Sequence, residues 1–241
     1  MIVAIDGPAG SGKSTTARRV AERLGYVYLD TGAMYRAGAL RLMRSGEAVD
    51  SERAGSIVRE SRIAVAFVEG EMRVLLDGVD VTREIRAPEV GSVASRVSKL
   101  APVREGLVQL QREIANSFLQ QGTGVVLDGR DIGTVVFPDA QVKIFMIADP
   151  MVRAQRRQAE LSLIGRHMKL ETVLLEIQQR DRQDTERAVA PLRKAEDAYL
   201  LDTTRASMKE QEDFIVERVW ERASETTVKP SSYPSPGAGT D

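Results

Sequence analysis

The chain has 241 residues, a formal net charge of −1 and no cysteine. With 42% hydrophobic and 29% charged residues, it has the composition of an ordinary globular protein. The near-neutral charge argues against broad binding to nucleic acid or to a membrane surface, and the lack of cysteine excludes disulfides, thiolate metal sites and cysteine nucleophiles.

Two further patterns concern where the protein resides. No apolar run approaches the length that would cross a bilayer. The N-terminus lacks the basic start of a signal peptide and opens directly into a predicted strand. We therefore expect a cytoplasmic protein with neither nucleic acid nor a membrane as a partner.

A glycine-rich loop follows the first predicted strand, residues 2–6, and matches the pattern G-x-x-x-x-G-K-[ST]. Apolar residues after it recur at helical spacing, so a helix is predicted to begin near Lys13. Glycines let such a loop turn its N–H groups toward a phosphate, Lys13 adds a mobile charge, and the Ser14 hydroxyl is placed to bind Mg²⁺. The predicted ATP-binding residues here are Gly7, Pro8, Ala9, Gly10, Ser11, Gly12, Lys13, Ser14 and Thr15.

Four more short apolar runs predict parallel core strands, at residues 26–29, 124–127, 142–147 and 199–201. Asp6, Asp30, Asp128 and Asp202 stand at or directly after strand ends. Ligands of open parallel sheets bind outside the carboxyl ends of the strands, so these acids are candidates for the site. For Asp6 and Asp202, capping of the following helix is the alternative.

One segment breaks the strand–helix alternation. Residues 63–81 alternate apolar and polar side chains, with turns at Glu69-Gly70-Glu71 and Asp77-Gly78. The pattern predicts an antiparallel meander inserted between the second and third core strands of an α/β fold.

Two polar clusters follow core strands. Thr31, Tyr35 and Arg36 lie at the start of the helix after the second strand, where they could hold a nucleotide's phosphate and base or belong to a surface helix. Asp128 closes the third strand, where phosphate-loop enzymes keep the acid that binds Mg²⁺ through water. Arg130 can contact a phosphate in bidentate fashion, and Asp131 could accept a hydrogen bond from a sugar hydroxyl or act as a base.

Arginines gather in two predicted helices. Arg153, Arg156 and Arg157 share one face of the helix that Asp149-Pro150 begins, and Arg180, Asp184 and Arg187 share a face of the next. Charged runs on helices are usually solvated, but phosphoryl transfer gathers negative charge that positioned arginines offset. A capping box at residues 207–210 predicts the last helix. Residues 226–241 are rich in Pro, Ser and Gly and are predicted to be a disordered tail after a single domain over 1–225.

Four stretches resemble the bacterial cytidylate kinases, a family within the nucleoside monophosphate kinases. They are residues 5–14, 29–36, 128–140 and 180–192, and the run Asp-Gly-Arg-Asp-Ile-Gly-Thr at 128–134 is far more specific than the phosphate loop. Thr31 stands where this family is expected to have serine, and Ser14 where it often has glycine. The resemblance implies a P-loop NTPase-type parallel sheet flanked by helices, an antiparallel monophosphate-binding insertion at about 36–110 and a short lid at about 151–170.

The resemblance also implies roles for particular residues. The CMP site would comprise Thr31, Tyr35, Arg36, Ser95, Arg104, Arg130, Asp131, Arg180, Asp184 and Arg187. Arg153 and Arg157 would belong to the lid over ATP. The catalytic set would be Lys13, Asp128, Arg130, Arg153 and Arg187, with Mg²⁺ held by Ser14 and, through water, by Asp128.

The implied activity is transfer of the ATP γ-phosphoryl group to CMP or dCMP by a monomeric enzyme. The single histidine, His167, lies in the lid-like stretch. The small number of candidate bases suits a phosphate acceptor, which is already ionised at neutral pH. The alternatives are a kinase for another monophosphate, such as UMP or AMP, and a nucleotide-binding switch without transfer activity. The Asn-Lys-x-Asp motif typical of guanine-binding switches does not occur in the sequence.

Overall fold

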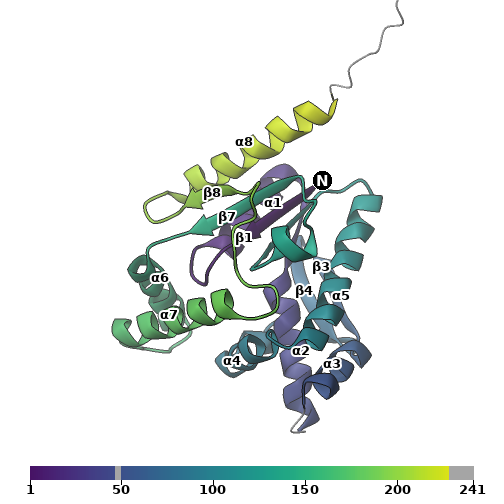
Figure 1. The fold of residues 1–241 in the computed structure, drawn as a ribbon, viewed down its shortest axis with the longest axis vertical. Coiled ribbons are helices and arrows are strands. Elements are labelled where there is room, and N and C mark those ends of the chain that lie inside the picture. The colour runs from purple at the N-terminus through teal and green to yellow at the C-terminus, as the bar shows by residue number, and fades with distance from the viewer. Residues whose placement is uncertain (47–49, 228–241) are drawn as a thin grey trace, which may run out of the picture.

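A computed structural model describes residues 1–46 and 50–227 of the chain (Figure 1). Its centre is a five-stranded sheet in the order β2 (Val27–Asp30), β6 (Val125–Gly129), β1 (Ile2–Asp6), β7 (Val142–Ile147) and β8 (Tyr199–Asp202). All four neighbouring pairs run parallel. The five predicted core strands are confirmed to within two residues at either end.

Successive residues of β1 point to opposite faces of this sheet, as the period of a strand requires. Ile2 and Ala4 join the apolar cluster formed with α2 (Thr31–Ser45) and α5 (Ala101–Gln120). Val3 and Ile5 join the cluster formed with α1 (Lys13–Leu24) and α8 (Met208–Thr227). The sheet is therefore covered on both faces, which explains why its strands are apolar throughout.

The predicted meander is confirmed as a second sheet, in the order β3 (Ile63–Val68), β4 (Glu71–Leu76), β5 (Val79–Asp80). Both strand pairs are antiparallel. Around it lie α3 (Ser51–Glu60), the 3-10 turn η1 (Glu84–Arg86) and α4 (Pro88–Val97). Phe67 of β3 packs edge-on against Phe118 of α5, with ring centroids 5.3 Å apart. The insertion is thus fastened to the helix that leads back into the core.

Beyond β7 the chain forms a helical hairpin of α6 (Pro150–Leu163) and α7 (Leu170–Glu186). Asp149 caps α6, because its carboxylate accepts from the backbone N–H of Met151 at 2.8 Å. The two helices enclose an apolar cluster separate from the main core, made of Ala154, Leu161, Val173 and Ile177. The α7 end of the hairpin lies near α4 (Figure 1). No helix within the described ranges is long and apolar enough to cross a bilayer.

Four local expectations need correction. Arg187 does not share a helical face with Arg180, because α7 ends at Glu186 and Arg187 has extended backbone angles. Asp6 does cap a helix, but it is the π-helical turn η2 (Ile132–Val136), more than a hundred residues away. Asp202 accepts from Thr204 in a turn and does not cap α8. That helix continues to Thr227, into the segment expected to be disordered, and the rest of the predicted tail lies outside the described residues.

Candidate active site

The phosphate loop joins β1 to α1 and depends on two glycines. Gly7 has φ 151°, and a Cβ there would lie 2.1 Å from the carbonyl oxygen of Met146 on β7. Gly12 precedes α1 in the left-handed conformation, with φ 95°. Side chains at these two positions would push the loop off the neighbouring strand or strain its backbone. The first N–H groups of α1 are thus available to an anion.

Lys13 is folded back into this loop. Its Nζ donates to the carbonyl oxygen of Pro8 at 2.6 Å and to Oγ of Ser11 at 3.3 Å, and the side chain is buried. Burial and, next, the Arg130 guanidinium hold the pKa of Lys13 well below its usual range. A phosphate bound in the loop would place negative charge next to the Lys13 ammonium group and would favour its charged form.

Ser14 and Asp128 meet across the carboxyl ends of the strands. The Ser14 hydroxyl donates to Oδ2 of Asp128 at 2.7 Å, and the Tyr28 hydroxyl donates to Oδ1 at 2.9 Å. Burial first, and then the carboxylate of Asp30, raise the pKa of Asp128. A hydroxyl beside a buried carboxylate provides the oxygen donors that Mg²⁺ prefers.

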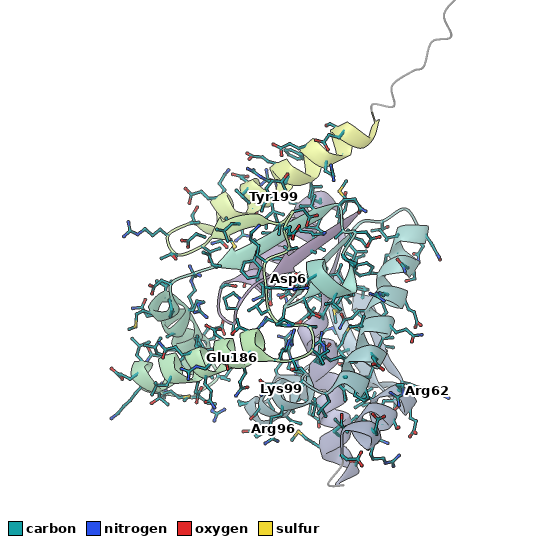
Figure 2. The ribbon with its side chains drawn as sticks, viewed as in Figure 1. Asp6, Arg62, Arg96, Lys99, Glu186 and Tyr199 are labelled. Carbon is teal, nitrogen blue, oxygen red and sulfur yellow. The ribbon has the colours of Figure 1, made fainter. Side chains whose placement is uncertain are left out.

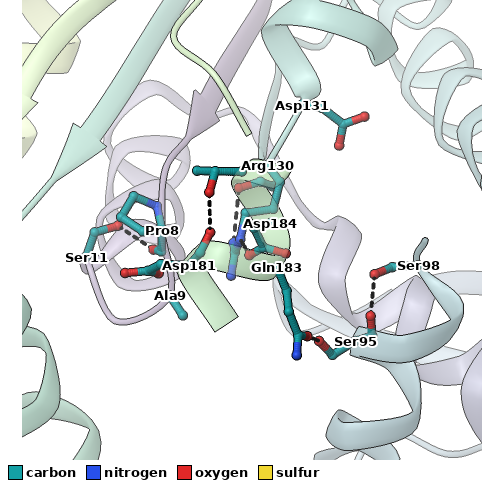
Figure 3. A network of polar contacts seen from close by, with 12 residues as sticks. Pro8, Ala9, Ser11, Ser95, Ser98, Arg130, Asp131, Asp181, Gln183 and Asp184 are labelled. Carbon is teal, nitrogen blue, oxygen red and sulfur yellow. Dashed lines mark hydrogen bonds and ion pairs between the residues drawn. The ribbon is translucent and has the colours of Figure 1, made fainter. Parts of the chain in front are cut away.

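A second group of charged side chains faces the phosphate loop. Nε of Arg130 donates to Oδ2 of Asp184 at 2.8 Å. Figure 3 shows this pair between the loop, at Pro8, and Ser95 of α4. Burial alone would raise the pKa of Asp184, but the Arg130 guanidinium holds it below its usual value. The charges of Arg130 and Asp184 also act on Lys13, so the two groups of site residues lie close together.

Asp131 is the centre of a separate buried cluster. Its two carboxylate oxygens accept from Arg104 and from Arg187, the latter at 3.3 Å. The Arg104 guanidinium also lies 5.7 Å from the ring centroid of Tyr35. The Tyr35 hydroxyl is buried with no partner among the described residues, and burial is the main cause that raises its pKa to about 12. A buried hydroxyl that has no internal partner is available to a ligand.

The end of β2 carries a third charged group. Asp30 caps α2 by accepting from the N–H of Ala33 at 2.8 Å. Its other oxygen accepts from Arg36 at 3.1 Å and from Arg86 of η1 at 3.3 Å. Two guanidinium groups against one carboxylate leave net positive charge at the end of β2. The Thr31 hydroxyl donates to the backbone oxygen of Asp128 at 2.6 Å, which joins the ends of β2 and β6.

The expected lid residues occupy different environments. Arg153 is buried, and its guanidinium donates to the carbonyl oxygen of Ala9 at 3.2 Å and to Asp181 at 2.6 Å. Arg157 is exposed and contacts Glu160 at 3.0 Å. Of the two, only Arg153 touches the phosphate loop.

Two expected acceptor residues lie on α4 and α7. Ser95 donates to Gln183 of α7 at 3.5 Å, which bridges the insertion and the hairpin. Arg180 is exposed and makes no hydrogen bond to any residue of the described ranges. It nevertheless feels the charges of Arg130 and Asp184.

With this geometry established, the chain can be compared with known proteins. A family model described as cytidylate kinase matches residues 3–224. The chain belongs to the cytidylate kinase family. It is 52% identical over 219 residues to a cytidylate kinase of Salinibacter ruber, covering 91% of this chain and 96% of the relative. It is 48% identical over 225 residues to one of Chloroherpeton thalassium, covering 90% and 92%.

A solved structure supports the fold alone. An uncharacterized protein from Eubacterium ventriosum aligns with a TM-score of 0.51 at 13% identity, over 91% of this chain and 98% of the other. At this identity the comparison says nothing about substrate. The assignment to the cytidylate kinase family therefore rests on sequence.

Two polar residues at the site, Tyr28 and Arg86, were not predicted from the sequence of this cytidylate kinase family member. Tyr28 lies within a strand whose other residues are mostly apolar. Its hydroxyl is the feature that could have indicated a site residue, because a buried tyrosine needs a hydrogen-bond partner. Arg86 lies in a short turn of the insertion, and no pattern around it indicated that it would pair with Asp30. Its role follows only from the packing of the insertion against β2.

The stability of this cytidylate kinase family member is predicted to depend on pH through Asp6. Burial raises the pKa of Asp6 from 3.8 to about 6, and the nearby charge of Asp131 adds to this rise. The N–H bonds from Gly133 and Ile132 and the charge of Lys13 oppose it. Because the folded protein binds this proton more readily than the unfolded chain, the stability contributed by Asp6 rises as pH falls through 6 toward 3.8. From pH 7 to pH 4 the wild type should gain up to about 3 kcal/mol over Asp6→Asn. Urea denaturation of both proteins across this range measures the difference, and a constant difference would contradict the prediction.

Proposed function

We propose that this protein transfers the γ-phosphoryl group of ATP to CMP or dCMP, giving ADP and CDP or dCDP. The observation that carries the proposal is the closeness of two groups of charged and polar side chains. The phosphate loop and the Ser14–Asp128 pair form one group, and the Arg130–Asp184 pair, whose charges act on Lys13, forms the other. Membership of the cytidylate kinase family supports this choice of reaction.

In the proposed reaction, an oxygen of the acceptor phosphate forms the new bond to the γ-phosphorus. The bond from that phosphorus to the bridging oxygen of ADP breaks. The acceptor phosphate has a second pKa of about 6, so it is ionised at neutral pH and needs no base. Both oxygens of Asp131 already accept from guanidinium groups, which occupy the positions from which it would contact an acceptor. The catalytic demand is alignment and charge neutralisation.

We assign the donor half to Lys13, Ser14 and Asp128. Lys13 would leave the Pro8 carbonyl and neutralise the β and γ oxygens of ATP. Bound Mg²⁺ would supply further neutralisation of these oxygens, held by Ser14 and, through water, by Asp128. In the described residues no three carboxylate or imidazole groups are arranged to hold a metal. This suits Mg²⁺, which keeps several waters and takes ligands from substrate phosphates.

We assign the acceptor half to the arginines opposite. Arg36, Arg130 and Arg187 would hold the acceptor phosphate. Arg180, Asp184 and the unpartnered Tyr35 hydroxyl would contact the nucleoside. The α6–α7 hairpin would be the lid, carrying Arg153 and Arg157 over ATP and excluding water from the transfer.

A coupled assay of ADP release tests the proposal. The protein is supplied with Mg-ATP and, separately, with CMP, dCMP, UMP, AMP or GMP. Rapid release with CMP and dCMP alone is the expected result. Preference for another monophosphate would keep phosphoryl transfer but overturn the assigned acceptor. Slow ATP hydrolysis at the same rate with every monophosphate would indicate a nucleotide-binding switch instead.

Asp184→Asn should weaken use of the acceptor selectively. The substitution removes the charge that orients Arg130, and hydrogen bonds to charged groups contribute about 1.5–3 kcal/mol. We expect kcat/KM for CMP to fall about 10- to 100-fold, while KM for ATP changes little. Glu186→Gln, two residues further along the chain at an exposed position, is the matched control and should behave as wild type. An equal loss for both substrates would argue against an acceptor role.

A further inference from the structure

Asp6 makes a direct connection between the strand that leads into the phosphate loop and the turn that follows Asp131. Its Oδ1 accepts from the backbone N–H of Ile132 and its Oδ2 from that of Gly133, both at 2.8 Å. The side chain is 5% exposed, and Figure 2 places it near the middle of the molecule. The two bonds join β1 to η2 although the partners are more than a hundred residues apart in the chain.

The contact of Asp6 with η2 lies directly beside both groups of site residues. The next residue, Gly7, begins the phosphate loop and is pinned against the Met146 carbonyl of β7. On the other side, Ile132 directly follows Asp131, which binds Arg104 and Arg187. Asp6 therefore directly precedes the donor loop, and its partner Ile132 directly follows Asp131 of the acceptor cluster.

We infer that Asp6 is a positioning residue, which sets the distance between the phosphate loop and the acceptor-binding residues that follow β6. The inference rests on the proposed function, because it concerns the alignment of two substrates. It assigns Asp6 no contact with either substrate. Its carboxylate acts through the backbone of η2, and its two oxygens match the two adjacent N–H groups that a π-helical turn leaves free at its start.

Stability alone does not account for a carboxylate here. Burial disfavours the ionised form of Asp6 and raises its pKa to about 6, so at neutral pH the folded protein holds the carboxylate at a cost relative to its protonated form. A neutral side chain would avoid that cost. Only an acceptor with two oxygens, however, can hold both N–H groups of η2 at the same distance from β1.

The chain offers a matched control at the other end of η2. Arg112 of α5 donates to the carbonyl oxygens of Val136 and Val135 at 2.8 and 2.7 Å. It fastens the same turn but has no link to the phosphate loop. If Asp6 only stabilised η2, variants of Asp6 and of Arg112 would change kcat and Tm in the same way. If Asp6 positions the phosphate loop, only the Asp6 variants would lose kcat.

The test compares Asp6→Asn, Asp6→Ser and Arg112→Met with the wild type. For each protein, kcat is measured with Mg-ATP and CMP, and the Kd of each nucleotide alone is measured by calorimetry. We expect both Asp6 variants to lose about 10- to 100-fold in kcat, since small misplacements of reacting groups have effects of this size. Both Kd values should stay near those of the wild type, and Arg112→Met should keep kcat while its Tm falls.

Several results would overturn the inference. These are an unchanged kcat in both Asp6 variants, Kd values that rise in step with the loss of kcat, or an equal loss of kcat in Arg112→Met. Absence of a cooperative unfolding transition in both Asp6 variants would assign Asp6 to folding alone and would also overturn it. Lack of CMP-dependent turnover by the wild type would instead contradict the proposed function, so the two failures are distinguishable.

Discussion

Lys13→Ala is expected to lower kcat for phosphoryl transfer by at least about 10³-fold, because it removes the mobile positive charge nearest the transferred group. The fold should survive the change. Among the described residues, Nζ of Lys13 bonds to Pro8 and Ser11 alone. The Ser11 hydroxyl itself donates to the Pro8 carbonyl at 3.0 Å. That carbonyl therefore keeps a partner, and the variant also loses a buried ammonium group that burial disfavours.

The measurement is the CMP-dependent rate of ADP release, with the thermal unfolding midpoint recorded for the same samples. Lys209→Ala is the control, because Lys209 is exposed on α8, outside the proposed lid, and the substitution removes the same charge. It should retain wild-type turnover. Turnover within tenfold of wild type in Lys13→Ala would refute the role given to Lys13, and a large fall in its Tm would show that the lysine is structural.

Asp131→Ala is expected to cause the largest loss of stability among single changes at the site. The carboxylate compensates two guanidinium groups, those of Arg104 and Arg187, whose side chains are each 4% exposed. Removing one partner from a buried ion pair strands the remaining charge, which destabilises proteins by about 3–5 kcal/mol. The Arg104 guanidinium keeps its bond to the Ser98 carbonyl and its contact with the Tyr35 ring, so part of the cluster remains partnered.

Urea denaturation at neutral pH gives the free energy of unfolding for this comparison. Glu160→Gln breaks the exposed pair with Arg157 and is the control, because exposed ion pairs contribute about 0–1 kcal/mol. A loss below about 1 kcal/mol in Asp131→Ala would mean that water reaches the two guanidinium groups in solution. The cluster would then be no more than a surface ion pair.

Local patterns in the sequence were enough to predict the elements of this fold. The five core strands, the meander at 63–81, the Asp149 cap of α6 and the capping box of α8 each depend on residues close together in the chain. The phosphate loop belongs to the same class, since its glycines, lysine and serine are consecutive. Resemblance to the cytidylate kinases supplied the family, which the comparisons confirm.

Charge clusters were predicted less completely, because spacing along a helix does not determine what a side chain meets. Arg153 and Arg157 are neighbours on α6, yet one is buried against the phosphate loop and the other is exposed. Arg187 was placed on a helix that in fact ends one residue earlier. Its contact with Asp131 comes from the segment after α7, whose path the sequence pattern did not indicate.

The sequence by itself therefore determined the strand–helix order, the phosphate loop and the family. Only the tertiary structure decided which charges pair: Arg130 with Asp184, Asp131 with Arg104 and Arg187, and Asp6 with the backbone of η2. The physical reason is the separation along the chain between the residues that interact. Caps, turns and alternation arise from interactions within a few residues, whereas these pairs join residues 27 to 126 positions apart and form only when β1, β6 and the helices beyond them pack together.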